Sequence, residues 1–293
     1  MNPSPISLRA VLLAGFCATA LHGPAVAQSL DELDDDPAVL AEAFVRNRVR
    51  PHEAALTGGA AATRLNPANF PKAPAVRVAE QWRVPGYALV AAELSNSASA
   101  TDLYLFVDST AAGWRIAAVR EFELPGIYYR QLERYRNQGE RSIRAAYEER
   151  FRASAERGVS RGEHERVHGT ADDRVFQVFN LRLASGADRD LARHHEVLRA
   201  RFDELRGLLE AMPPSPLPRA LDDETVGDLL RYLLVREAYR PAQGPLRLVV
   251  AEVDGKELGY LYCAEAACMP TPTPNGIVAL RDLGAGWYLY RRV

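Results

Sequence analysis

The chain has 293 residues, enough for one large or two modest domains. Its 36 Lys and Arg residues stand against 38 Asp and Glu residues, so the formal net charge at pH 7 is only −2. This near balance of charge argues against a nucleic-acid binder and against a protein held on anionic membranes by basic residues.

Residues 1–27 have the pattern of a secretory signal peptide. Arg9 supplies the positive charge, a short apolar core follows, and Ala25-Val26-Ala27 provides the small residues of a cleavage site. A membrane-spanning helix needs about 20 apolar residues, so this core is too short for an anchor, and no later segment suffices either. Arginine rather than lysine dominates the basic residues, which is typical of a GC-rich bacterial genome. We therefore predict cleavage after Ala27 and a periplasmic location; the alternative for this segment is an N-terminal core helix.

Cleavage would leave two cysteines, Cys263 and Cys268. An even pair in an exported chain predicts an intramolecular disulfide, provided that residues 264–267 form a turn. A metal site is the alternative, but no further ligand lies close to them in the sequence.

The first element expected in the mature chain is a helix that starts at the aspartates 34–36 and runs to about Val49. Leu40, Phe44 and Val45 would form its buried stripe. Residues 51–75 are rich in Ala, Gly, Asn and Pro and predict a long connection. The apolar runs and turn signals that follow predict strands over 76–84, 87–95, 103–108 and 114–124.

Residues 126–212 are expected to be mostly helical, with 175–183 fitting either a short helix or a strand. Near the end of this stretch, a four-three spacing predicts a heptad seam that packs against a second helix, hence a helical hairpin. We interpret His195 in this seam as a packing residue. The seam consists of Leu191, His195, Leu198, Phe202, Leu205, Leu209 and Met212.

The C-terminal quarter repeats the order of a helix followed by strands. Acidic residues open a helix at 222–224, and Asp254-Gly255 is a strong signal for a two-residue hairpin. The strands expected here are 246–253, 258–263, 276–282 and 287–292.

A pair of glycine-aromatic motifs occurs twice, which indicates an internal repeat. Gly86-Tyr87 and Gly113-Trp114 have the same spacing as Gly259-Tyr260 and Gly286-Trp287. We therefore predict an α+β fold of two related units, each a helix with an antiparallel sheet, separated by a helical-hairpin insertion. By element order alone, each unit resembles the cystatin-like and NTF2-like folds. The expected domains are the signal peptide 1–27, an N-terminal unit 28–125, the insertion 126–218 and a C-terminal unit 219–293.

The segment from His164 to His168 matches the pattern His-Glu-x-x-His. On a helix this spacing puts both imidazoles on one face to bind zinc, with Glu165 as general base, and over these residues it resembles the zincin metallopeptidase motif. However, the flanks are polar, Arg166 is charged where an uncharged residue is usual, and no third ligand is evident. We therefore expect a solvated polar connection without zinc, and keep a zinc-dependent hydrolase as an alternative.

The same stretch contains a Gly-x-Ser-x-Gly match around Ser160, but charged helical sequence precedes it where a nucleophile elbow needs a buried strand. The sequence thus favours no catalytic residue and no cofactor. We expect an exported, non-enzymatic protein that binds a protein of the cell envelope, such as an inhibitor, a toxin-immunity protein or an assembly factor. Arg130 and Arg134, set among tyrosines, are the candidate interface residues. A small-ligand-binding protein is the further alternative.

Overall fold

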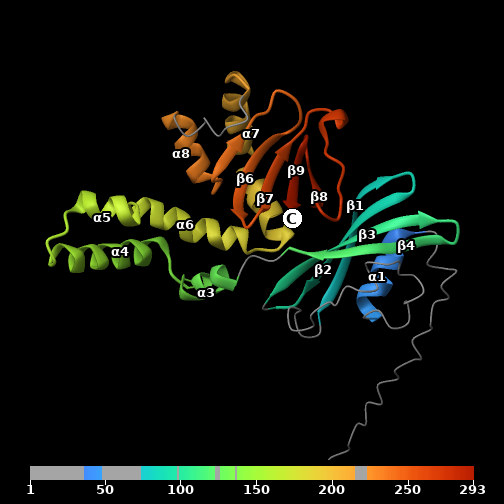
Figure 1. Ribbon diagram of the computed structural model, residues 1–293, viewed down its shortest axis with the longest axis horizontal. Helices are drawn as coiled ribbons and strands as arrows, with labels where there is room; N and C mark the ends of the chain where they lie inside the picture. Colours follow the sequence, from blue (N-terminus) through green and yellow to red (C-terminus); the bar gives the residue numbers. More distant parts are fainter. Residues whose placement is uncertain (1–35, 48–73, 98, 123–125, 136, 215–222) are drawn as a thin grey trace, which may run out of the picture.

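The computed structural model describes residues 36–47, 74–97, 99–122, 126–135, 137–214 and 223–293. The predicted signal peptide, its cleavage after Ala27 and most of the predicted connection 51–75 lie outside these ranges. Within them the chain combines helices with two antiparallel sheets, which confirms the predicted α+β class (Figure 1). No helix in the described ranges has the length and apolar character needed to cross a bilayer.

The N-terminal part is a four-stranded meander with a helix across one face. Asp36 caps this helix, because its Oδ1 atom accepts a hydrogen bond from the Ala38 amide at 2.8 Å. Leu40 and Phe44 are each 1% exposed and pack on the sheet, which confirms the predicted stripe. The elements are α1 (Pro37–Asn47), β1 (Ala75–Val84), β2 (Tyr87–Ser95), β3 (Ala100–Thr110) and β4 (Gly113–Glu121).

The C-terminal part is a five-stranded sheet in the order β5-β6-β7-β9-β8, preceded by a helix. Asp254 and Gly255 have φ angles of 51° and 78°, so both adopt the left-handed conformation that the predicted hairpin requires. The helix is α8 (Glu224–Tyr232), and the strands are β5 (Glu237–Tyr239), β6 (Leu246–Val253), β7 (Lys256–Tyr262), β8 (Ile277–Gly284) and β9 (Trp287–Arg292).

The two sheets do not share a strand order, so the structure does not confirm two related units. Gly86 lies in a hairpin turn with φ 81°, whereas Gly259 lies inside β7. A Cβ atom on Gly259 would come within 2.0 Å of the Leu248 carbonyl oxygen, so close strand approach, and not a turn, requires that glycine. The matching glycines Gly86 and Gly259 are therefore required for different structural reasons.

Along the sequence, a series of helices follows β4 and precedes α8: α3 (Gly126–Tyr135), α4 (Glu140–Ala155), α5 (Arg161–His168), α6 (Ala171–Ala184) and α7 (Asp188–Ala211). The ambiguous segment 175–183 is helical, as part of α6. Helix α4 packs against α5 and α6, and the three together project away from the sheets (Figure 1). We call α4, α5 and α6 the arm.

The seam of α7 packs on the C-terminal sheet and on α8, and not along a second helix of the insertion as a hairpin, which corrects the prediction of a heptad hairpin. Phe202 and Leu205 are 0% exposed and belong to one apolar cluster with Trp287 of β9 and residues of α8. A four-three spacing marks only one apolar side of a helix, and here a sheet face and the short helix α8 cover that side. The boundaries 125/126 and 218/219 remain a prediction.

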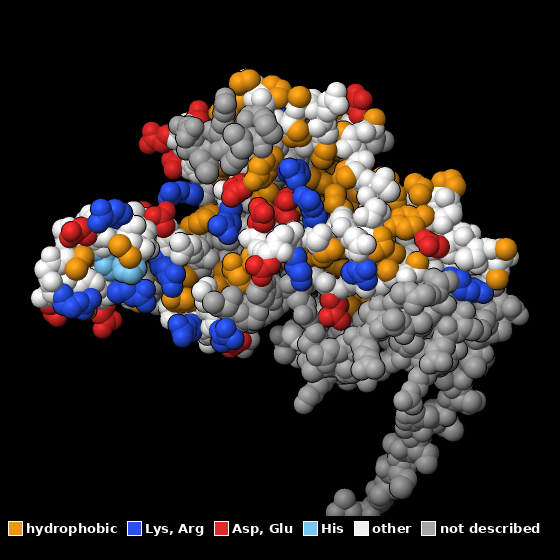
Figure 2. Space-filling model, in the orientation of Figure 1, with side chains coloured by type: hydrophobic (Ala, Val, Ile, Leu, Met, Phe, Trp, Pro, Cys, Tyr) orange, Lys and Arg blue, Asp and Glu red, His pale blue; other side chains and the backbone are white. Residues whose placement is uncertain are grey.

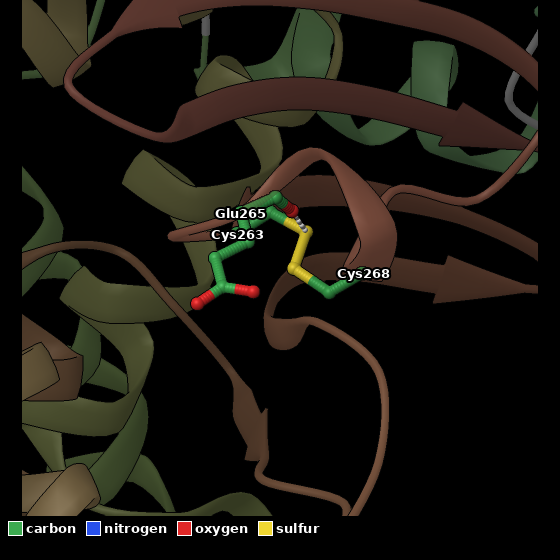
Figure 3. Close-up of a disulfide and its surroundings, with 3 residues drawn as sticks. All are labelled: Cys263, Glu265 and Cys268. Carbon is green, nitrogen blue, oxygen red and sulfur yellow. Dashed lines mark hydrogen bonds between the residues drawn. A yellow bond between two sulfur atoms is a disulfide. The ribbon is translucent and has the colours of Figure 1, made fainter.

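Cys263 and Cys268 lie at disulfide distance just after β7, with Cα atoms 5.8 Å apart (Figure 3). The short helix Ala266–Cys268 turns the chain between them. Gly286 packs close by: a Cβ atom there would lie 2.7 Å from the Cys263 carbonyl oxygen, and its φ is 80°. This contact holds the start of the loop against the β8–β9 turn.

We expect Leu205→Ala to lower the free energy of unfolding by about 2–5 kcal/mol, because it removes a fully buried side chain from between α7 and the sheet. Val197→Ala on the same helix is the matched control, since Val197 is 72% exposed, and it should stay within about 0.5 kcal/mol of the wild type. Denaturant unfolding measures both. Equal effects of the two changes would contradict the packing of the seam.

Candidate functional site

A buried ionic junction joins the two sheets at the start of α7. The side chains of Arg291 and Asp188 are 5% and 4% exposed, and the Arg291 Nε atom donates to Asp188 Oδ1 at 2.7 Å. The Tyr104 hydroxyl donates to the same oxygen at 3.0 Å. The Asp188 amide in turn donates to Asp102 Oδ2 at 2.8 Å. Residues of β3, α7 and β9 thus meet in one polar cluster.

Asp102 is the titratable member of this junction near neutral pH. Burial, followed by the negative charge of Asp188, raises the pKa of Asp102 to about 7, while Arg291 acts in the opposite direction. Glu93, opposite Asp102 on the neighbouring strand, raises the pKa further. The junction therefore gains a second carboxylate charge only as the pH rises through neutrality.

At the far end of the arm, Ser160 is the N-cap residue of α5. The Ser160 side chain accepts from the Glu163 amide at 3.3 Å, and the Ser160 amide donates to Glu163 Oε2 at 3.0 Å. This is a capping box, which begins a helix by satisfying its first free amides. The Gly-x-Ser-x-Gly match is thus accounted for by helix capping.

The His-Glu-x-x-His segment forms α5, and His164 is 1% exposed, so the expectation of a solvated connection is wrong for this residue. Its ring lies 5.3 Å from that of Tyr147 and 5.5 Å from that of Phe151, centroid to centroid. These two aromatic residues of α4 lie four positions apart and form a surface that His164 covers. Burial, and then the nearby His168, lower the pKa of His164.

The structure brings together two of the three residues of the zinc hypothesis. The rings of His164 and His168 are 4.6 Å apart, and neither nitrogen of His164 has a hydrogen-bond partner within the described chain. Glu165 instead faces Arg161 at 3.5 Å. The described residues contain no group of three or more His, Cys, Asp or Glu side chains placed to hold a metal ion. A zinc site here would need ligands from elsewhere.

A cavity of about 430 Å³ lies at the base of the arm, between α3, α6 and β6. Arg174 places its guanidinium over the ring of Tyr135, 4.9 Å from the centroid. Arg182 ties α3 to α6 by donating to the carbonyl oxygens of Tyr135 and Gln138. The residues that line this cavity include Tyr128, Tyr135, Arg174, Phe176, Asn180 and Arg236.

Asn180 anchors this base to the C-terminal sheet. Its Nδ2 atom donates to the Val250 carbonyl oxygen at 2.7 Å and to that of Leu234 at 2.8 Å. Leu234 has a φ of 55°, and Val250 sits at an irregularity in the pairing of β6 with β7. Asn180 is one of three polar residues in the largely apolar run 175–183, and sequence reasoning missed its role.

The predicted interface residues Arg130 and Arg134 lie exposed on α3. Each precedes in sequence a residue that lines the cavity, Gln131 and Tyr135. The structure thus brings them near the base of the arm, far from the histidines of α5 (Figure 1).

Comparison of the chain with protein-family models, curated proteins and solved structures found no match. The functional argument therefore rests on the residues and geometry described above.

We expect Asp102→Asn to stabilise the protein more at pH 8 than at pH 5, and to be nearly neutral only below about pH 4. In the folded protein Asp102 stays protonated up to a pKa of about 7, whereas in the unfolded chain it ionises near its usual value of about 4. Folding therefore binds a proton between these values, so this group contributes stability at low pH that is lost as the pH rises to about 7. The amide of asparagine keeps the acceptor for the Asp188 amide without gaining charge.

Thermal melts at both pH values measure this difference, with the exposed Asp228→Asn on α8 as the matched control. A gap between wild type and Asp102→Asn that does not grow from pH 5 to pH 8 would show that Asp102 is ionised in both states at pH 5.

We expect native protein exchanged into metal-free buffer to contain no stoichiometric zinc by elemental analysis. His168→Ala should leave the melting temperature unchanged, because His168 is exposed. Alanine at the buried His164 would instead disturb the arm, so His168 is the more informative position. Stoichiometric zinc that disappears in His168→Ala would overturn this expectation and favour the hydrolase.

Proposed function

We propose that the protein is an exported, non-enzymatic protein-binding module, such as an inhibitor, a toxin-immunity protein or an assembly factor. The arm and the cavity at its base would form the contact surface. The observation that carries this proposal is the arm itself, a helical projection joined to the body at one end (Figure 1).

The arm has the internal order that a binding surface needs. The Tyr147 hydroxyl donates to the Gly169 carbonyl oxygen at 2.7 Å, which joins α4 to the turn between α5 and α6. Exposed ion pairs, such as Arg144 with Asp172 at 2.5 Å, cross between the helices but contribute little each. The aromatic contacts of His164 with α4 supply an apolar core at the far end. A preordered surface loses less conformational entropy on binding than a flexible one.

The outer surface of the arm is mixed in character. Figure 2 shows arginine and acidic side chains distributed along it around a histidine patch. Val167 of α5 is 70% exposed, which places an apolar side chain among these charges. A polar surface with isolated apolar contacts suits a non-obligate partner rather than a permanent subunit interface.

The cavity at the base supplies the pocket that such interfaces centre on. Tyr128, Tyr135 and Phe176 provide aromatic walls, and Arg174 and Arg236 provide donors. Tyrosine and arginine are enriched among the residues that carry most binding energy. A cavity of about 430 Å³ can accept a large side chain of a partner. A small ligand could use the same space, and the capture experiment below separates these two functions.

We expect Arg130→Glu and Arg134→Glu, combined in one variant, to weaken capture of a partner from a cell-envelope extract while the melting temperature stays unchanged. Both residues are exposed, so the change should cost no more than about 0.5 kcal/mol in the free energy of unfolding. Arg46→Glu on α1 is the control, because Arg46 is also exposed and lies on the helix that covers the N-terminal sheet, away from α3 and the arm.

A second variant, Val167→Glu, tests the far end of the arm. If capture by the wild type survives the α3 reversals and Val167→Glu alike, the arm is a spacer. If the wild type captures no protein but retains a small molecule after purification, the ligand-binding alternative replaces the proposal.

A further inference from the structure

A shallow groove of about 800 Å³ lies between α7 and β8, on a surface that does not include the arm. Arg189, Arg193 and Arg199 of α7 line it together with Arg281 of β8. Two acidic residues, Glu196 and Asp282, lie among them. The charged side chains of the groove thus carry a formal excess of two positive charges, in a chain whose own net charge is −2.

Two of the four guanidinium groups are already engaged. Arg189 pairs with Glu93 of β2 at 2.8 Å, and Arg199 donates to the Leu283 carbonyl oxygen at 3.2 Å. The guanidinium groups of Arg193 and Arg281, in contrast, make neither a hydrogen bond nor an ion pair within the part of the chain that the structure describes. Like charges gathered in one groove repel each other, so an anionic ligand would relieve a cost that the free protein bears.

His195 lies at the inner side of the groove and adds no charge to it. It is 1% exposed, and burial lowers its pKa to about 4, so the ring is neutral at physiological pH. Its Nε2 atom has no hydrogen-bond partner within the described residues. The inner side therefore carries one unsatisfied polar atom next to the arginines.

The length of the groove indicates what kind of anion it suits. From Arg189 to Arg199 the α-helix rises about 15 Å, at about 1.5 Å per residue. One phosphate group is far shorter than that, whereas four or five residues of an extended peptide, at about 3.3 Å each, would cover it. Guanidinium groups bind carboxylates in a two-point geometry, so acidic side chains along such a peptide can each meet an arginine.

We propose that this groove binds an acidic segment of a partner protein, with carboxylates of the segment paired to Arg193 and Arg281. The proposal rests on the protein-binding function above and adds the chemistry of the partner. The groove is a surface separate from α3 and the arm, so the proposal for the groove and the proposal for the arm can fail independently.

The test uses fluorescence anisotropy of the full-length protein with a labelled ten-residue peptide of alternating Glu and Ala. A peptide with Gln in place of Glu is the uncharged counterpart. The acidic peptide should bind, and its counterpart should not. Arg193→Glu combined with Arg281→Glu should weaken binding at least tenfold, whereas Arg46→Glu on α1, with the same charge change per site and an exposed pair with Glu42 to lose, should not alter it. Glu196→Gln should tighten binding, because it removes a carboxylate from the groove.

Equal binding of both peptides, no binding at low salt, or equal losses from the groove variant and Arg46→Glu would overturn the proposal. Displacement of the acidic peptide by inorganic phosphate at a lower concentration than by unlabelled peptide would assign the groove to small anions instead. The Arg130 and Arg134 reversals should leave peptide binding intact. If the Arg130 and Arg134 reversals abolish partner capture while peptide binding persists, the surface around α3 and the arginine groove act separately. If the wild-type protein captures no partner while peptide binding persists, only the function assigned to the arm is lost.

Discussion

The buried pair of Arg291 and Asp188 is the interaction on which the arrangement of this molecule depends. Both charges are removed from water, which costs several kcal/mol for each ion unless hydrogen bonds replace the lost solvation. Here Tyr104 and the Gly186 carbonyl oxygen provide some of those bonds, and the Arg291 guanidinium also lies over the ring of Phe122, whereas Asp188 Oδ2 has no hydrogen-bond partner within the described residues. Such a pair favours one placement of α7 on the C-terminal sheet, because any other placement would leave a buried charge alone.

The same pair fixes the elbow between the arm and α7. Helix α6 ends at Ala184, α7 begins at Asp188, and Arg291 binds both Gly186 in the elbow and the first residue of α7. Asn180 anchors α6 to the C-terminal sheet one turn earlier. The directions of the arm and of the arginine-lined side of α7 are therefore set by a few polar contacts, whereas the apolar seam of α7 sets only how deeply it packs.

Local patterns predicted the elements well because each depends on nearby residues. Strands β6 and β9 begin and end at the predicted residues, and the stripe of α1 is the one predicted. Patterns that depend on a distant partner failed. The α7 seam predicts an apolar side but cannot tell a helix from a sheet as its neighbour, and His164 is buried by two residues of α4 that no spacing rule connects to it.

The polar contacts at the candidate sites could not be predicted from the sequence either, because their partners are far apart along the chain. Asp188 and Arg291 lie 103 positions apart, and Asn180 and Val250 lie 70 apart. The repeat is not confirmed for a different reason, because Gly86 serves a turn and Gly259 a close strand approach, although Gly113 and Gly286 both have a positive φ at a hairpin turn. Identical letters at equal spacing are weak evidence when glycine has more than one structural use.

The proton on Asp102 links the junction to the arginine groove through the N-terminal sheet. Asp102 faces Glu93 across the β2–β3 pair, and Glu93 holds Arg189 at one end of the groove. When Asp102 is protonated, Arg291 faces the single carboxylate of Asp188, and the charged residue opposite Glu93 in the sheet is Arg77 of β1. When Asp102 ionises, repulsion acts on Asp188 and on Glu93 together, on the two contacts by which β2 and β3 hold the start of α7. Deprotonation of Asp102 therefore adds a carboxylate charge where the N-terminal sheet meets the start of α7, and Arg291 and the Asp188 amide are the groups that offset it, while Asn180 keeps the base of the arm attached to the other sheet.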